Sequence, residues 1–474
     1  MSASCSVMPV IRRRVRGQSS PMSHIHVPSE IPIRYLARSK KWDMIFLGMF
    51  VVGFVGFFFA WSIDPDRAWQ SYVSNWLFFT NIAMGAVLLT VVTWITKAKW
   101  NWSVRRVSLA FVAFLPVSLV MFVPMLLLGE SYFPWIAEVA QDPILDPILA
   151  KKSAYLNPTF LLARNVIGVL VLFGMSLYFA YLALRPDMGL TEGHADADQA
   201  FDTGTGAIVS TNRGREFCRE GLSRGWLGQE IEEVVSYRRM TRLAPAFVIV
   251  YAVVMSMLSY DWVMSLEPHW FSTMMGPWFF MGAFWSGIAA TAITVTFLKR
   301  EGDVLDKAMG RQQLHDLGKL TFAFSVFWAY LFFAQYLVIW YGKLPWEQIW
   351  IIHRAEEPWG KWSALLIVMC FVVPFAGLIG RKPKMTPWIF RSIAIVLLAG
   401  LWLEKHLMVA PSVRSADTPT LGVTELVVAL MFLGIFLYTI RWFLSTFPLI
   451  QVWQPMVDPE TFEVEMAASG MSYE

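Results

Sequence analysis

The sequence has 474 residues, of which 56% are hydrophobic and only 16% charged, and its formal net charge is +4. A soluble domain usually has about 25% charged residues, so this composition excludes a water-soluble globular protein and indicates an integral membrane protein. The three cysteines are scattered and form no CxxC pair, which argues against an iron–sulfur cluster or a zinc site on this chain.

The first 42 residues are polar and basic and include the run Arg12, Arg13 and Arg14. No apolar segment of signal-peptide length follows them, because the first apolar run is already long enough to span a membrane. We therefore predict residues 1–42 to be a basic tail without a cleaved signal.

Ten apolar runs follow, each close to the roughly 20 residues that a membrane-spanning helix needs. They cover residues 43–62, 72–95, 105–128, 159–183, 243–261, 276–298, 317–341, 359–379, 387–409 and 422–447. Backbone polar groups in lipid must be satisfied within the segment, so the pattern predicts an all-α polytopic membrane protein. Three prolines within the runs are expected to kink their helices, namely Pro116, Pro124 and Pro374.

The connecting segments alternate between basic and less basic. Lysine and arginine concentrate in the first tail and in residues 96–106, 184–242, 299–316 and 380–386. The positive-inside rule puts these segments in the cytoplasm, together with both termini and a C-terminal tail, residues 448–474. We expect the second half of the 185–242 loop to lead as an interfacial helix into the fifth span, with Pro245 at its entry.

The transmembrane domain, residues 43–447, shows a weak internal repeat. The first span is followed by Trp61-Ser62-Ile63-Asp64-Pro65 and the fifth by Met264-Ser265-Leu266-Glu267-Pro268. Similar matches link the third span to the seventh and the fourth to the eighth. Repeats of this kind are common in membrane bundles that hold a site between their halves.

The stretch Tyr260–Gly276 places Asp261, Glu267 and His269 between two apolar runs. It is either an interfacial loop rich in tryptophan or a site that handles protons or quinone, since ionisable groups at membrane depth are usually functional. We also expect this stretch and residues 343–359 to dock partner subunits, because aromatic and mixed-charge surfaces suit interfaces.

The ninth span carries Glu404, Lys405 and His406, three consecutive ionisable residues that are costly in an apolar run unless they pair or face a cavity. Glu404 and Lys405 should point about 100° apart on an ideal helix, so we expect them to face different neighbours. We predict one polar cavity for Asp261, Glu404 and His406, with Arg164 or Lys405 as countercharge. Glu425 is a further candidate on the same half.

On the opposite half, the seventh span begins with His315, Asp316 and Lys319 and continues to Gln335 and Tyr336. Asp316 and Lys319 are three residues apart and are expected to pair. These residues predict the mouth of a proton path, although an ordinary helix start with an interfacial lysine fits the same pattern. Polar residues deeper in the span could equally form helix–helix hydrogen bonds.

Three stretches of the sequence then suggest a family. SYDWVMSLEPHWFST, LHDLGKLTFAFSVFWAYLFFAQYLVIWYG and WLEKHLMVAPS resemble the F-type membrane subunit (ActF) of bacterial alternative complex III. The resemblance covers nearly all ten spans. It implies two four-helix bundles, from the second to fifth and the sixth to ninth spans, flanked by the first and tenth.

The resemblance also implies a function in the bacterial plasma membrane. Such a subunit would have no redox centre of its own and would belong to a menaquinol-oxidising complex that reduces a cytochrome c or blue-copper acceptor. The implied partners are a larger NrfD-like (polysulfide-reductase-type) membrane subunit, multihaem and monohaem cytochromes c with haem c, and an iron–sulfur subunit. Proton conduction or scaffolding is the implied role. A quinone-binding subunit, a secondary transporter and a purely structural anchor remain alternatives.

Overall fold

The computed structural model describes residues 10–12, 30–129, 132–136, 147–191, 218, 220–299, 306, 308–414 and 420–453. Ten helices within these ranges are long and apolar enough to cross a membrane, which confirms the predicted all-α, multi-pass membrane protein. Eight of the spans are single helices. They are α1 (Lys40–Ile63), α2 (Pro65–Ile95), α7 (Pro158–Leu190), α9 (Gln229–Trp262), α10 (Met275–Leu298), α12 (Arg311–Gly342), α17 (Pro387–Val413) and α18 (Val423–Thr446).

The other two spans change their hydrogen-bonding pattern near the prolines expected to kink them. The third consists of α3 (Arg105–Leu109), η1 (Ala110–Phe114), α4 (Leu115–Phe122) and η2 (Val123–Leu127). The eighth consists of α14 (Gly360–Ile367), a π-helical turn η6 (Val368–Val372) and α15 (Val373–Leu378). A proline has no N–H to donate and clashes with the preceding turn, so the helix tightens or widens beside it.

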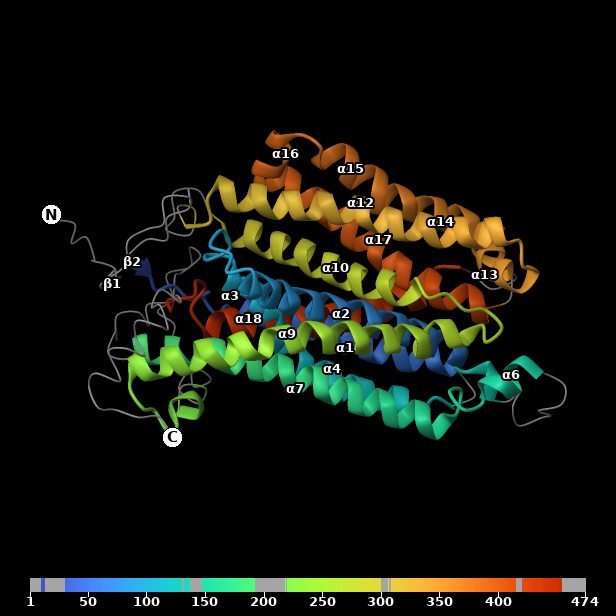
Figure 1. The fold of residues 1–474 in the computed structure, drawn as a ribbon, viewed down its shortest axis with the longest axis horizontal. Coiled ribbons are helices and arrows are strands. Elements are labelled where there is room, and N and C mark those ends of the chain that lie inside the picture. The colour runs from blue at the N-terminus through green and yellow to red at the C-terminus, as the bar shows by residue number, and fades with distance from the viewer. Residues whose placement is uncertain are drawn as a thin grey trace.

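Short elements complete the described chain. They are β1 (Val10–Arg12), which pairs antiparallel with β2 (Glu30–Pro32), and the helical turns α6 (Pro147–Lys152), η5 (Met264–Leu266), α13 (Pro345–Ala355) and α16 (Arg381–Met385). Figure 1 shows β2 and α16 at one end of the elongated bundle and α6 and α13 at the other. We call these the tail end and the α13 end.

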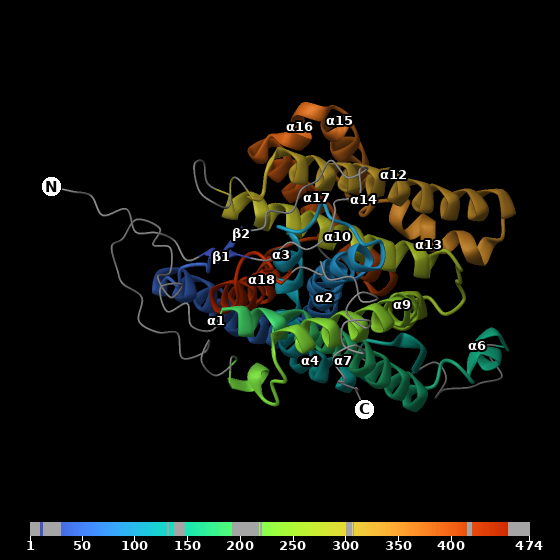
Figure 2. The same ribbon diagram turned by 60° about the vertical axis from the view of Figure 1, so that its left-hand side comes forward.

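The spans form two four-helix bundles, as the resemblance implied. The first contains α2, the α3–η2 span, α7 and α9; the second contains α10, α12, the α14–α15 span and α17. The two bundles meet mainly along α2 and α10, while α1 and α18 pack against each other beside the first bundle (Figures 1 and 2). In its most apolar window α2 is 89% buried and α1 only 17%, so α2 is central and α1 peripheral.

Small residues allow the two bundles to approach closely. A Cβ added to Gly85 of α2 would lie 1.8 Å from the carbonyl oxygen of Ala283, and one added to Gly287 of α10 would lie 2.1 Å from the backbone nitrogen of Ala86. Membrane helices gain little from the hydrophobic effect on association, so close backbone packing of this kind supplies much of their attraction.

One expectation about the connecting segments needs correction. The second half of the 185–242 loop leads as a helix into the fifth span, as expected, but this helix is continuous from Gln229 and Pro245 lies inside α9 instead of at its entry. The C-terminal segment begins buried, because Leu449 donates its N–H to the carbonyl of Arg34 and Trp453 is 1% exposed. The first half of the 185–242 loop lies largely outside the described residues, as does the tail beyond Trp453.

Candidate functional site: buried ion pairs at the α13 end

Asp261 is the first of four acids that pair with basic residues at the α13 end. It is 0% exposed and ends α9. Arg164 of α7 binds both of its carboxylate oxygens, with Nε–Oδ2 at 2.8 Å and Nη2–Oδ1 at 2.6 Å. Asn165 and Tyr155 donate further hydrogen bonds at 2.6 and 3.0 Å. Arg164 is therefore the countercharge of Asp261, one of the two possibilities that the sequence predicted.

Local sequence explains how these donors reach Asp261. Asn157 caps the start of α7 by accepting from the backbone N–H groups of Thr159 and Phe160, and the next two turns carry Arg164 and Asn165. Burial, with the nearby Asp261 carboxylate, raises the pKa of Tyr155. Its hydroxyl therefore remains a hydrogen-bond donor well into the alkaline range.

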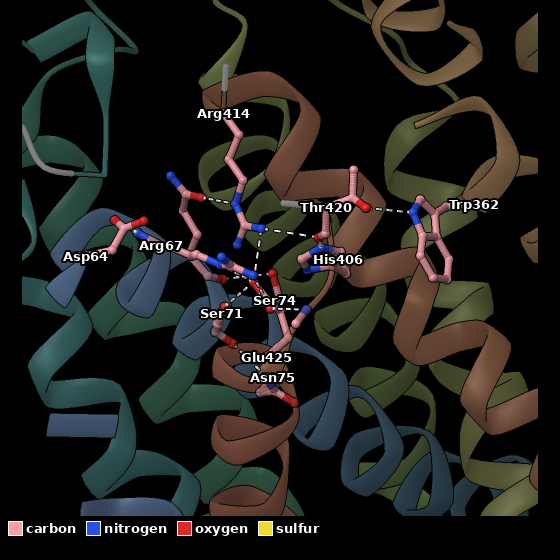
Figure 3. Close-up of polar contacts among 12 residues, drawn as sticks. Asp64, Arg67, Ser71, Ser74, Asn75, Trp362, His406, Arg414, Thr420 and Glu425 are labelled. Carbon is pink, nitrogen blue, oxygen red and sulfur yellow. Dashed lines mark hydrogen bonds and ion pairs between the residues drawn. The ribbon is translucent and has the colours of Figure 1, made fainter. Parts of the chain in front are cut away.

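Glu425, near the start of α18, is the second buried acid. Arg67 of α2 binds it in bidentate fashion at 2.9 and 2.8 Å, and Arg414 lies 3.0 Å from Oε1 (Figure 3). The backbone N–H of Gly422 donates to Oε2 at 2.7 Å, which fixes the first turn of the helix. Burial lowers the pKa of Arg414, and the Glu425 carboxylate partly offsets this effect.

His406 of α17 lies beside this group but takes a different partner. Its Nε2 is 2.8 Å from the carbonyl oxygen of Thr420, whose hydroxyl accepts from Trp362 (Figure 3). The ring stacks on Trp402, which donates to the side chain of Asn75 in α2. His406 therefore connects α17, α14 and the segment before α18.

Glu267, just after η5, is the third acid, and Arg354 of α13 binds it at 3.3 Å. Arg354 also donates to the carbonyls of Leu407 and Met408 in α17 at 2.9 and 3.0 Å. The Leu407 carbonyl can accept because Pro411, four residues later, has no N–H. Burial lowers the pKa of Arg354 to about 10, so it remains charged at neutral pH.

Glu404 of α17 is the fourth acid and is 1% exposed. Lys405 lies 2.7 Å from Oε2, and the indole of Trp328 in α12 donates to Oε1 at 2.6 Å. The Lys405 ammonium also lies 4.4 Å from the ring centroid of Phe279. The prediction that Glu404 and Lys405 face different neighbours is therefore wrong, because the long, flexible lysine chain reaches back around the helix.

The expected single cavity for Asp261, Glu404 and His406 also needs correction. Their described hydrogen bonds belong to three separate networks: Asp261 binds donors from the first bundle, Glu404 binds Trp328 and Lys405, and His406 binds Thr420. The expectation rested on the similar depth in the membrane predicted for Asp261 and Glu404. These two residues lie on corresponding helices, but the helices belong to different bundles.

The aromatic residues of Tyr260–Gly276 are mostly enclosed by the chain itself. Trp262 and Trp270 are 0% and 1% exposed, and Trp270 stacks on Trp350 with ring centroids 4.4 Å apart. His269 and Phe271 are exposed. The tryptophans of this stretch are thus buried within the chain, whereas the α13 region exposes apolar side chains: Leu344 just before α13, and Trp346, Ile349 and Ile352 within it.

At the tail end, the predicted pair forms, with Lys319 Nζ 2.6 Å from Asp316 Oδ1. His315 Nδ1 is buried and has no hydrogen-bond partner among the described residues. Gln335 is buried, whereas Tyr336 is 41% exposed on the outside of α12 and does not face the bundle interior. Gln335 and Tyr336 therefore do not line a common path.

Sequence reasoning missed three arginines as site residues: Arg67, Arg354 and Arg414. Their position in the sequence could have identified them, because basic residues are few in the connecting segments of this end. Each binds one of the four acids, as does Arg164. Among the described residues, no group of three or more His, Cys, Asp or Glu side chains could hold a metal ion.

The four acids thus fall into two classes. Asp261, Glu267 and Glu425 pair with arginine, which keeps its charge in proteins, whereas Glu404 pairs with lysine, whose protonation changes readily on burial. Glu404 is therefore the one acid of the four whose cation is a lysine. No protein-family model matches the chain, and no curated protein matches it significantly.

Proposed function

We propose that this chain is a membrane subunit of a quinol-oxidising electron-transfer complex of the alternative complex III type. It has no redox centre of its own; it moves protons and anchors peripheral cytochrome and iron–sulfur subunits. The motif resemblance supports the assignment to this kind of complex, and the two four-helix bundles with two flanking helices agree with it.

The observation that carries the proton role is the Glu404–Lys405 pair. Both side chains are almost fully buried, at 1% and 2% exposure, within an apolar helix of a membrane bundle. Ionisable groups at such positions are costly and mark ion or proton pathways. A proton that reaches Glu404 neutralises the carboxylate and frees Lys405 to release its own, so the pair can exchange protons without an unpaired charge being left.

The anchoring role is supported by the α13 end. The exposed apolar residues Trp346, Ile349 and Ile352 lie along one face of α13, which is tied to α17 by Arg354. Aromatic side chains are enriched at the cores of protein interfaces. A partner bound there would rest on an element fixed to the helix that carries Glu404.

The proposal is tested on the intact complex purified from native membranes. Haem absorbance co-eluting with this chain is the first expected result, and its absence would favour a transporter or an isolated anchor. In proteoliposomes, Glu404→Gln is expected to preserve assembly and abolish proton movement linked to menaquinol oxidation. Unchanged proton movement in a well-assembled Glu404→Gln complex would refute the proton role.

A further inference from the structure

Gly282 of α10 leaves room beside the carboxylate of Glu404. Gly282 is buried, yet outside its chain neighbours and its own helix backbone the one heavy atom of the described residues within 4 Å of an added Cβ is Glu404 Oε2, at 3.8 Å. Other buried glycines of the bundle behave differently: an added Cβ would lie 1.8 Å from backbone at Gly85 and 2.7 Å from Cys370 Sγ at Gly400. Gly282 is therefore not explained by close helix packing.

Unpartnered polar groups continue from this space toward the α13 end. Trp278 lies one helical turn before Gly282 on the same face of α10, and Gln335 lies two turns beyond Trp328 on the same face of α12. Trp278 Nε1 and both amide atoms of Gln335 are buried without a hydrogen-bond partner among the described residues. Buried polar groups normally find a partner in protein or in ordered water.

The same holds for the next aromatic pair. Trp278 lies 6.3 Å from Trp350 between ring centroids, and Trp350 stacks on Trp270. The indole nitrogens of Trp350 and Trp270 also lack a partner within the described part of the chain. The unpartnered groups thus extend from Glu404 to the short elements that close the α13 end.

We propose that the space at Gly282 binds a water molecule on Glu404 Oε2, the first of a short row of waters held by Trp278, Gln335 and the Trp270–Trp350 pair. This inference rests on the proposed proton role and specifies its route. Such waters typically make about three hydrogen bonds to groups that the protein leaves unsatisfied.

The chemistry of the lining suits transfer along water. An indole N–H only donates, and the Gln335 amide donates and accepts without titrating, so neither group traps the proton. When protonated Glu404 gives its proton to the first water, that water passes one of its own protons to the next oxygen. One O–H bond forms as another breaks at each step. The ion pair of the carboxylate with Lys405 is restored when the lysine takes up a proton to replace the one that it released.

The substitution Gly282→Ala tests this site with little risk to the fold. A methyl group fits at 3.8 Å from Glu404 Oε2, and alanine favours a helix over glycine. Gly174→Ala in α7 is the matched control, since it is the same change in a membrane helix with nothing within 4 Å of the added Cβ. Both variants are made in the intact complex.

The direct readout is a density map of the complex at a resolution that shows ordered waters. We expect a peak within hydrogen-bonding distance of Glu404 Oε2 beside Gly282, present in wild type and Gly174→Ala and lost in Gly282→Ala. In proteoliposomes, Gly282→Ala is expected to slow the rate of proton release by about tenfold or more, while the Gly174→Ala control releases protons at the wild-type rate.

The outcomes separate this inference from the proposed function. Absence of the wild-type peak overturns the water site whatever the activity. A peak whose loss in Gly282→Ala leaves proton release unchanged overturns the route but not the role of Glu404. Unchanged proton release in Glu404→Gln defeats the proton role itself, and the route with it.

Discussion

Asp261 and Glu404 lie near the α13 end of corresponding helices in the two bundles, yet their surroundings differ. Three side chains donate to Asp261, including both nitrogens of the Arg164 fork. A bidentate guanidinium and two neutral donors hold the Asp261 carboxylate in one geometry. Asp261 therefore acts as a structural link that joins α7 to α9.

Glu404 accepts from fewer side-chain donors. Its two donors are Trp328 and the neighbouring Lys405, and one side of Oε2 faces the space at Gly282. Lysine is a compact charge that can lose its proton when buried. The comparison teaches that a buried acid in a membrane bundle is not by itself a proton carrier, because the identity of its cation and the access to Oε2 decide its role.

The largest effect is expected from Asp261→Asn, which leaves Arg164 buried without its countercharge. Breaking one side of a buried pair typically costs about 3–5 kcal/mol. We expect loss of folded protein, measured as the yield of monodisperse protein in detergent. Glu356→Gln, an exposed acid at the same end, is the control. A normal yield of Asp261→Asn would show that this ion pair is dispensable for folding.

The junction of the bundles provides the next test, because both acids depend on helices that it positions. Gly85→Leu would drive a side chain into the backbone of Ala283, and overpacking of this kind typically costs about 1–3 kcal/mol or more. We expect a lower thermal midpoint in detergent. Gly174→Leu, where no atom crowds the added Cβ, should leave the midpoint near that of wild type.

Glu404→Gln is the isosteric counterpart of Asp261→Asn and should behave differently. Lys405 can lose its proton once its partner is neutral, so we expect a stability loss smaller than that of Asp261→Asn. Thermal melts of the two variants side by side make the comparison. Equal destabilisation would show that Glu404 is also a fixed structural link.

Lys405→Arg would give Glu404 the kind of partner that Asp261 has. Because arginine keeps its charge in proteins, we expect near wild-type stability with loss of proton movement linked to quinol oxidation. The reverse change, Arg164→Lys, is the control and should reduce stability without creating a second proton site. Full proton movement in Lys405→Arg would contradict the importance of the lysine.

The smallest effect is expected from Tyr155→Phe, which removes one donor from Asp261 and leaves the Arg164 pair intact. Loss of one such hydrogen bond typically costs about 1 kcal/mol. The raised pKa of Tyr155 means that the wild-type hydroxyl stays protonated, and so keeps donating, as the pH rises through its ordinary range. The stability difference between wild type and Tyr155→Phe should therefore be constant from pH 7 to about pH 10.

The sequence by itself determined the class of protein and the number of its spans. Membrane helices must satisfy their own backbone and be apolar over a fixed length, so the ten spans could be recognised from the sequence, although the fifth begins at Gln229 instead of residue 243. The prolines at positions 116, 124 and 374 gave the irregular spans for the same local reason. The Asp316–Lys319 pair was also readable, because both partners lie within one helical turn.

Only the tertiary structure decided which acid meets which base. Arg67 and Glu425 are 358 residues apart in sequence, and Arg164 and Asp261 are 97 apart, so no helical spacing could pair them. Lys405 and Glu404 are the opposite case, because they are neighbours in sequence that an ideal helix would point in different directions. The flexible side chain of Lys405 nevertheless reaches the Glu404 carboxylate. The contrast between a fixed carboxylate at Asp261 and an open carboxylate at Glu404 therefore arises from helix packing, which places a guanidinium group beside one and leaves space at Gly282 beside the other.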